Sequence, residues 1–230
     1  PRRQRQMCIR DRSRMGKAQA GRALPGIMVP PTPAVVLAAG LSRRLGRPKA
    51  MVQVNGRAVV RWVCDRLRRA GCHPVVVVVN EQTASDVGRA VPWALLAVNP
   101  NPDAGRTGSL QLGLTALVEE TGATLERAVM APVDRPGWTS DVVAALLAAS
   151  GDVAPLHEGR SGHPVVLSSA SIEAVMVSGR DRPLRELVAF SGVPVSAPWL
   201  GLNLDTEEDI ERLLADAAVL DACFSEGEGI

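Results

Sequence analysis

The chain has 230 residues, a length typical of one α/β domain, and hydrophobic residues make up 46% of it. Aromatic residues contribute only 3% and tyrosine is absent, so valine, alanine and leucine must fill the core, as in buried parallel strands covered by helices. No apolar run approaches the roughly 20 residues that a membrane-spanning helix needs, so we expect no membrane partner.

The formal net charge of +2 is distributed unevenly along the chain. Residues 1–30 contain one acid, Asp11, and these basic residues: Arg2, Arg3, Arg5, Arg10, Arg12, Arg14, Lys17 and Arg22. We expect this leader to be disordered and outside the native domain, with a native start at Met28 or Met15; a transit peptide is the alternative. The remainder is slightly acidic, which gives no electrostatic case for nucleic-acid binding.

The cysteines indicate neither a zinc site nor a disulfide framework. Cys8, Cys64, Cys72 and Cys223 form no CxxC pair and have no spacing typical of zinc ligands. Reduced thiols in a cytoplasmic protein are the expected state.

From residue 34 onward, short apolar runs alternate with amphipathic segments. The apolar runs predict strands at 34–38, 75–79, 95–98 and 128–131. The segments with helical periodicity predict helices at 57–70, 81–90, 109–120 and 140–149. Strands separated by helices favour right-handed βαβ units, so we expect an α/β fold of three layers, doubly wound around a mostly parallel sheet.

The pattern changes after residue 150. Apolar runs at 152–156 and 164–167 flank a polar turn and predict a small antiparallel excursion from the parallel sheet. Thr206 and Asp209 have the spacing of an N-terminal capping pair, which predicts a last helix over 206–217. One domain is therefore expected over 31–218, followed by a flexible acidic tail at 219–230.

The most informative segment is LAAGLSRRLGRPK at residues 37–49, directly after the first predicted strand. Ligands of open α/β sheets bind beyond the carboxyl ends of the strands. Gly40, Ser42 and Gly46 allow the backbone N–H groups of such a loop to approach phosphate oxygens. The segment therefore predicts a phosphate-binding loop.

Two basic side chains of this segment, Arg44 and Lys49, supply the positive charge that a triphosphate requires. A P-loop does not fit, because five residues separate the two glycines and alanine follows Lys49. A dinucleotide-binding GxGxxG fingerprint does not fit either, because Ser42 occupies the position of its second glycine.

The same segment resembles the LAAGxSxRxGxxK signature of the MobA-like nucleotidyltransferases, and every fixed position is met. Other segments are similar to further motifs of that family in the expected order: NP…G…SL at 99–110, PVDxP at 132–136, GHP at 162–164 and the closing DTPED stretch at 205–209. The resemblance covers about residues 34–215 and implies a fold like that of nucleotide-diphospho-sugar transferases.

Within this family the chain is most similar to the molybdenum cofactor cytidylyltransferases, or MocA-like enzymes. Its first motif has Leu-Ala-Ala-Gly where guanylyltransferases tend to have Leu-Ala-Gly-Gly, and its acidic motif has Pro-Val-Asp rather than Pro-Cys-Asp. The resemblance implies transfer of CMP from CTP to the phosphate of molybdopterin, with release of pyrophosphate. It also implies a possible second partner, an apo-molybdenum hydroxylase that receives the product.

The resemblance assigns a role to each motif residue. Arg44, Lys49 and Asp134 are the expected catalytic residues. Nucleotide binding is expected from Leu37, Ala38, Ala39, Gly40, Ser42, Arg44, Gly46, Lys49 and Ser109. Helix capping is the alternative role for Ser109.

Magnesium is the cofactor that the resemblance implies. Asp134 is expected to hold the ion against the α-phosphate, with Asp205 as its second ligand and Asn203 as the alternative. His163 and Asn203 are expected on the acceptor side. Two positions depart from the family pattern: Glu207 replaces a usual proline, and Leu45 replaces a common methionine.

Other functions stay open at this point. One is a transferase that uses GTP, or one whose acceptor is a sugar phosphate or an alcohol phosphate. Another is a factor that binds molybdenum cofactor and hands it on without chemistry. A Rossmann-type oxidoreductase is a third, which Ser42 disfavours.

Overall fold

The structure, a computed structural model, describes residues 31–225, so the predicted leader at 1–30 lies outside the described residues. Eight strands within this range form the main sheet: β1 (Ala34–Leu37), β4 (Val75–Val79), β5 (Leu95–Val98), β6 (Arg127–Pro132), β7 (Val153–His157), β8 (Arg160–Ser161), β9 (Val165–Ser168) and β10 (Ser191–Pro194). The short strands β2 (Gln53–Val54) and β3 (Arg57–Ala58) pair separately as an antiparallel ribbon.

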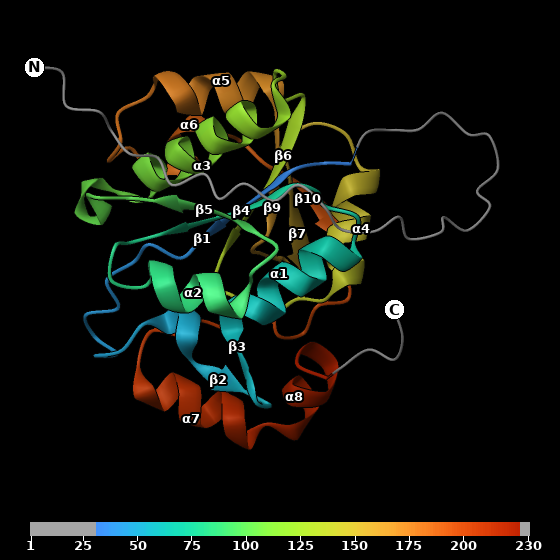
Figure 1. Ribbon diagram of the computed structural model, residues 1–230. Coiled ribbons are helices and arrows are strands. Elements are labelled where there is room, and N and C mark those ends of the chain that lie inside the picture. Colours follow the sequence, from blue (N-terminus) through green and yellow to red (C-terminus); the bar gives the residue numbers. More distant parts are fainter. Residues whose placement is uncertain (1–30, 226–230) are drawn as a thin grey trace, which may run out of the picture. The chain divides into compact units, whose positions relative to one another are not determined.

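Helices cover both faces of the main sheet (Figure 1). The α-helices are α1 (Val59–Arg69), α2 (Ala84–Ala90), α3 (Arg106–Thr121), α4 (Ser140–Ala148), α5 (Ser169–Val177), α6 (Leu184–Leu187), α7 (Glu207–Ala215) and α8 (Ala217–Cys223). Two short 3-10 helices are η1 (Lys49–Met51) and η2 (Pro102–Ala104). Helices α3 and α5 pack on one face, and α1 and α4 on the other. No helix of the described part has the length and apolar content to cross a membrane.

The strand order is β10-β7-β9-β6-β1-β4-β5, with β8 paired to β7. The central strands β6, β1, β4 and β5 are parallel neighbours. Strand β9 runs antiparallel to both β6 and β7, and β8 forms a hairpin with β7. The expected fold class, a mostly parallel sheet between helical layers with a small antiparallel excursion, is confirmed.

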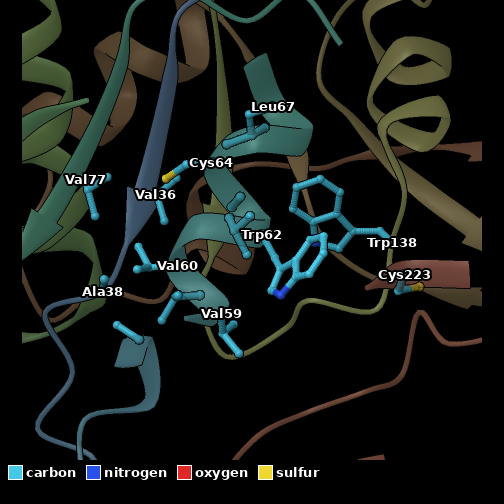
Figure 2. Packing of buried hydrophobic residues seen from close by; sticks show 14 of the residues in the cluster. Val36, Ala38, Val59, Val60, Trp62, Cys64, Leu67, Val77, Trp138 and Cys223 are labelled. Atoms are coloured by element: carbon cyan, nitrogen blue, oxygen red, sulfur yellow. The ribbon is translucent and has the colours of Figure 1, made fainter. Parts of the chain in front are cut away.

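Alternate residues of the central strands supply two separate cores. Val36 and Val77 belong to the cluster under α1, whereas Val35 and Val78 belong to the cluster under α3. All five residues of β4 are buried, as a strand covered on both faces requires. Figure 2 shows part of the first cluster, in which the α1 side chains lie beside β1.

Helix α1 carries a buried charge that the apolar periodicity did not reveal. Arg66 is only 3% exposed, and its guanidinium donates to the carbonyl oxygens of Pro136 and Trp138, each at 2.6 Å, and to that of Cys223. The guanidinium also lies over the rings of Trp138 and Phe224. Burial lowers the pKa of Arg66 to about 10, so the side chain stays charged at neutral pH.

The predicted helices differ from the observed ones mainly at their beginnings. Helix α1 begins at Val59 rather than at residue 57, because Arg57 and Ala58 pair with β2. Helix α3 begins at Arg106, three residues before the predicted start at Ser109. Ser109 therefore lies inside the helix, and its alternative role as a helix cap is wrong.

The C-terminal segment is more ordered than the sequence suggested. Helix α7 begins with the predicted capping box of Thr206 and Asp209. Beyond it, α8 runs from Ala217 to Cys223 and so overlaps the predicted flexible tail at 219–230, and Cys223 and Phe224 are buried. The Phe224 ring packs edge-on against Trp62 of α1, which holds this segment on the domain.

One glycine controls how closely α3 approaches the sheet. A Cβ on Gly113 would overlap a Val35 methyl group and lie 2.9 Å from Val78 Cγ2. Gly88 of α2 meets only the end of the Leu96 side chain, at 3.2 Å, and Leu96 is partly exposed and can move.

We therefore expect opposite effects from the same substitution at these two helical glycines. Gly113→Ala should lower the free energy of unfolding by about 1–3 kcal/mol, because it overpacks the core. Gly88→Ala should leave it unchanged or raise it by up to ~1 kcal/mol, because alanine favours the helix. Urea denaturation of both variants tests this; equal stabilities would show that α3 does not pack on β1 at this spacing.

Candidate functional site

The candidate site lies at one edge of the main sheet, where several strands end. The parallel strands β1, β4 and β6 lead at their carboxyl ends into the segments that begin at Ala38, Asn80 and Val133. Because β9 is antiparallel to β6, the turn before β9 that carries His163 opens at the same edge. Loops at this edge are the usual ligand-binding elements of such sheets.

The loop after β1 has a fixed backbone shape at residues 40–48. Ser42 and Gly46 have positive φ values of 50° and 71°, and the carbonyl oxygen of Ser42 accepts from the N–H groups of Leu45 and Gly46 at 3.0 Å each. The Ser42 hydroxyl accepts from the backbone N–H of Lys49 at 3.0 Å. Ser42 thus closes the loop and holds the start of η1, where Lys49 is placed.

Ion pairs hold this loop on both sides. Arg43 makes two contacts to the carboxylate of Asp103 in η2, at 2.8 and 3.0 Å. Arg47 pairs with Glu207, the first residue of α7. Glu207 is the residue that replaces the family's usual proline, so this departure supplies an ion pair to the loop.

The Lys49 ammonium lies between two carboxylates from distant parts of the chain. It is hydrogen-bonded to Asp205 and lies 3.5 Å from Asp134 Oδ2. All three side chains are mostly buried, with exposed fractions of 16%, 23% and 15% in the order Lys49, Asp205, Asp134. Arg44 is far more exposed, at 74%, and approaches Asp205 Oδ2 at 3.6 Å. The structure therefore brings together the four charged residues that the sequence singled out.

Backbone contacts bring the two carboxylates to the same place. The N–H of Leu204 donates to the carbonyl oxygen of Asp134 at 2.9 Å. The same two segments also approach closely at Gly137 and Trp199. A Cβ on Gly137 would overlap the carbonyl oxygen of Trp199. Asn203 donates its amide to Asp205 Oδ2 at 2.6 Å, so it orients the Asp205 carboxylate.

A small pocket of about 150 Å³ opens beside Lys49 and Asp134. Its lining includes most of the residues predicted for nucleotide binding: Leu37, Ala38, Ala39, Gly40, Ser42, Lys49 and Ser109. The Asn80 amide donates to the carbonyl oxygen of Ala39 at 3.1 Å, and the Asn99 amide donates to the Ser109 hydroxyl at 2.9 Å. The pocket wall is therefore fixed by two buried asparagines that the sequence analysis did not assign.

A larger pocket of about 520 Å³ adjoins the small one, and both are lined by Leu37, Arg106 and Pro132. His163 lines the larger pocket and is absent from the lining of the small one. Arg106 lies 3.9 Å from Asp134 Oδ2, at the boundary of the two pockets. Sequence reasoning missed Arg106 because it lay outside the fixed positions of the motifs.

His163 is held in its neutral form. Burial lowers the pKa of His163 to about 4; the positive charges of Arg135 and Arg106 act in the same direction, and the negative charge of Asp134 opposes them. Its buried Nδ1 has no hydrogen-bond partner among the described residues. A neutral imidazole with a free ring nitrogen can bind a ligand in the larger pocket, but it adds no charge there.

The carboxylates of Asp134 and Asp205 fit a divalent cation. Both already face one cation, the Lys49 ammonium, and carboxylate oxygens are the ligands that hard divalent ions prefer. Within residues 31–225, no cluster of three or more His, Cys, Asp or Glu side chains could hold a metal ion. A metal bound here would therefore need substrate oxygens and water as further ligands, which is usual for magnesium at phosphate-transfer sites.

Fold and site together define an α/β protein with a basic, glycine-containing loop and a carboxylate pair at the carboxyl edge of its sheet. The model of the MobA-like NTP transferase domain matches residues 34–196. The chain belongs to this family of nucleotidyltransferases.

Its relatives carry more than one activity in their names. The chain is 32% identical over 196 residues to a molybdenum cofactor guanylyltransferase of Rhizobium leguminosarum bv. trifolii, covering 76% of this chain and 88% of that protein. It is 30% identical over 206 residues to nicotine blue oxidoreductase of Paenarthrobacter nicotinovorans, covering 78% and 95% of the two chains.

Solved structures of the same fold support the architecture. A protein from Mycobacterium sp. strain JC1 superposes with a TM-score of 0.68 at 25% identity, covering 83% of this chain and 97% of that one. Molybdopterin-guanine dinucleotide biosynthesis protein A of Archaeoglobus fulgidus has a TM-score of 0.57 at 17% identity, covering 79% and 96%.

The charge cluster predicts a change in the titration of Asp205. The pKa of Asp205 lies below its ordinary value, mainly because of the hydrogen bond from Lys49, with Asn203 and Arg44 acting in the same direction. Lys49→Met should therefore raise the pKa of Asp205 in the metal-free protein. Carboxyl ¹³C NMR titration measures it, with Arg212→Met, whose contact is to Asp209, as the control. An unchanged Asp205 titration would show that Lys49 is not its partner.

Proposed function

We propose that the protein is a divalent-metal-dependent nucleotidyltransferase. It transfers a nucleoside monophosphate from its triphosphate to the phosphate of molybdopterin and releases pyrophosphate. The observation that carries this proposal is the meeting of Lys49, Asp134 and Asp205 beside a pocket lined by the phosphate loop. Molybdopterin is proposed as the acceptor because relatives over most of the chain are named molybdenum cofactor guanylyltransferases.

The reaction needs no protein nucleophile. The acceptor phosphate oxygen is anionic at neutral pH and attacks the α-phosphorus in line, while the bond from this phosphorus to the β-phosphate oxygen breaks. Pyrophosphate leaves with the electron pair of that bond. The residues of the chain contribute position and charge, which are the main sources of catalysis in phosphoryl-type transfer.

Each charged side chain has a defined task in this mechanism. Lys49 and Arg44 neutralise the triphosphate and the departing pyrophosphate. The phosphate loop, residues 37–49, positions the triphosphate. Asp134 and Asp205 hold the divalent cation, which supplies charge neutralisation at the α-phosphate. Asn203 keeps the Asp205 carboxylate oriented through its 2.6 Å hydrogen bond. We propose magnesium as this ion; manganese is a suitable alternative, since one structural neighbour is described as a complex with manganese.

The identity of the nucleotide rests on the first motif. Ala39 is 3% exposed and lines the small pocket, where guanylyltransferase relatives tend to have glycine. A methyl group at this wall reduces the room for a base, which favours cytosine over the larger guanine. We therefore propose CTP as the substrate, and the names of the guanylyltransferase relatives support GTP as the alternative.

Two functions of other classes are weighed against this one. The name of the Paenarthrobacter relative supports an oxidoreductase, but redox chemistry gives no reason for a lysine between two carboxylates at a phosphate loop. A carrier that only hands on molybdenum cofactor gives no such reason either. Product mass after incubation with labelled CTP or GTP, magnesium and molybdopterin separates the transferase from both alternatives, because only a transferase yields a dinucleotide.

We expect Lys49→Ala and Asp134→Asn each to lower turnover by about 10²–10³ with the fold intact, because each removes one preorganised electrostatic partner. Pyrophosphate release at saturating metal measures this, and circular dichroism checks the fold. Glu211→Gln, which removes an exposed carboxylate from α7, should retain full activity. Wild-type turnover by Asp134→Asn would refute the metal role of that residue.

Ala39→Gly should shift the nucleotide preference toward GTP. Removing the methyl group enlarges the small pocket, and a gain of about tenfold in the ratio of kcat/KM for GTP to that for CTP corresponds to about 1.4 kcal/mol. Leu41→Ala, in the same loop but absent from the pocket lining, is the matched control. A wild-type protein that already prefers GTP would contradict the CTP proposal without affecting the transferase proposal.

A further inference from the structure

The larger pocket is lined by an excess of positive charge. Among the described residues, its lining contains one acid, Asp181, and four arginines: Arg106, Arg135, Arg182 and Arg185. The arginines and the aspartate alone give the lining three more positive than negative charges. Such a chamber attracts a ligand with more than one negative charge.

Acidic side chains of the protein neutralise the positive charges of these arginines only weakly. Arg182 Nε lies 3.8 Å from Glu186, and both side chains are more than half exposed. Arg106 Nη2 lies 3.9 Å from Asp134 Oδ2, and the Arg106 side chain is largely exposed. For Arg135 and Arg185, no ion pair with an acidic residue exists within the described part of the chain. The guanidinium groups therefore remain available to a ligand.

The segment that carries Arg182 is fixed to the first turn of α3. The N–H of Gly108 donates to the carbonyl oxygen of Arg180 at 3.0 Å, and the Thr107 hydroxyl donates to the carbonyl oxygen of Arg182. A Cβ on Gly105 would overlap the Arg180 carbonyl oxygen, so glycine permits this approach. Hydrogen bonds therefore hold the segment that carries Arg182 against the first turn of α3, the turn in which Arg106 lies.

Part of the larger pocket's lining is apolar and buried. Leu110, Met130 and Val165 form part of it and are nearly fully buried, and Phe190 adds a ring. A volume of about 520 Å³ is in the range of pockets that enclose a small molecule. A flat heterocyclic body against this apolar lining would satisfy it better than a small, fully hydrated sugar.

We propose that the larger pocket binds the acceptor, and that Arg182 and Arg185 select acceptors that carry a second anionic group. Arg106 lines both pockets, so the attacking phosphate lies at this shared wall, near Asp134. Arg182 and Arg185 line only the larger pocket, which leaves them for an anionic group elsewhere on the same acceptor. This assignment rests on the proposed function, since the term acceptor presupposes transfer.

Binding of molybdopterin, followed by its pterin fluorescence without nucleotide, tests the assignment independently of turnover. The double variant Arg182→Ala/Arg185→Ala should bind it about tenfold or more weakly, because two charged hydrogen-bond donors are lost. Arg182→Lys/Arg185→Lys keeps the charge and should recover much of the affinity. Arg89→Ala removes an exposed arginine from α2 and serves as the control.

The kinetic counterpart separates the two pockets. In the transfer assay, the double alanine variant should raise the KM for molybdopterin about tenfold and leave the KM for the nucleotide unchanged. The proposal is overturned if the wild-type protein does not bind molybdopterin up to the millimolar range, or if the double alanine variant binds it equally well. If binding depends on the arginines but no dinucleotide forms, the proposed function fails, and the larger pocket stands as a molybdopterin-binding site but not as an acceptor site.

Discussion

The structure depends on one electrostatic arrangement, in which the Lys49 ammonium lies between the carboxylates of Asp134 and Asp205. Two carboxylates that close together and mostly buried repel each other unless a cation separates them. The cation therefore joins three segments that lie far apart in sequence: the phosphate loop, the loop after β6 and the segment before α7. In the proposed reaction, a divalent ion and a triphosphate would meet the same two carboxylates and the same lysine.

The buried Arg66 holds the segment that follows Asp134 through hydrogen bonds. Its guanidinium is bonded to the carbonyl oxygens of Pro136 and Trp138, directly after Asp134, and to that of Cys223 at the end of α8. A buried charge that is fully engaged with carbonyl oxygens and aromatic rings is costly to disturb. The loop that carries Asp134 is therefore attached to the core under α1. This attachment restrains the position of the Asp134 carboxylate.

Local patterns in the sequence were sufficient for the central sheet and for the loop after β1. The valine run of β4 and the LAAG segment encode their structure within a few residues, so periodicity and turn chemistry identify them. The start of α3 was missed because Gly105 caps it without any side-chain hydrogen bond. Helix α8 was missed although Asp216 caps its first turn; Phe224 also packs on Trp62, a long-range contact that composition does not predict. The motifs indicated Lys49 and Asp134 as site residues. They did not indicate the arginines of the larger pocket, because no fixed motif position contains them and only the folding of the chain brings them together.

The family includes relatives named for nucleotide transfer and a relative named for oxidoreduction, so the shared fold does not decide the chemistry. The decision falls to the side chains at the junction of the two pockets. On one side the phosphate loop, Lys49 and the carboxylate pair suit a metal-bound triphosphate; on the other, arginines beside an apolar lining suit an anionic ring compound. Arg106 lies where the two meet, within 3.9 Å of Asp134. The glycine-containing loop, the carboxylate pair and the arginine-lined pocket lie side by side, which is the arrangement that the proposed transfer between two phosphorylated substrates requires.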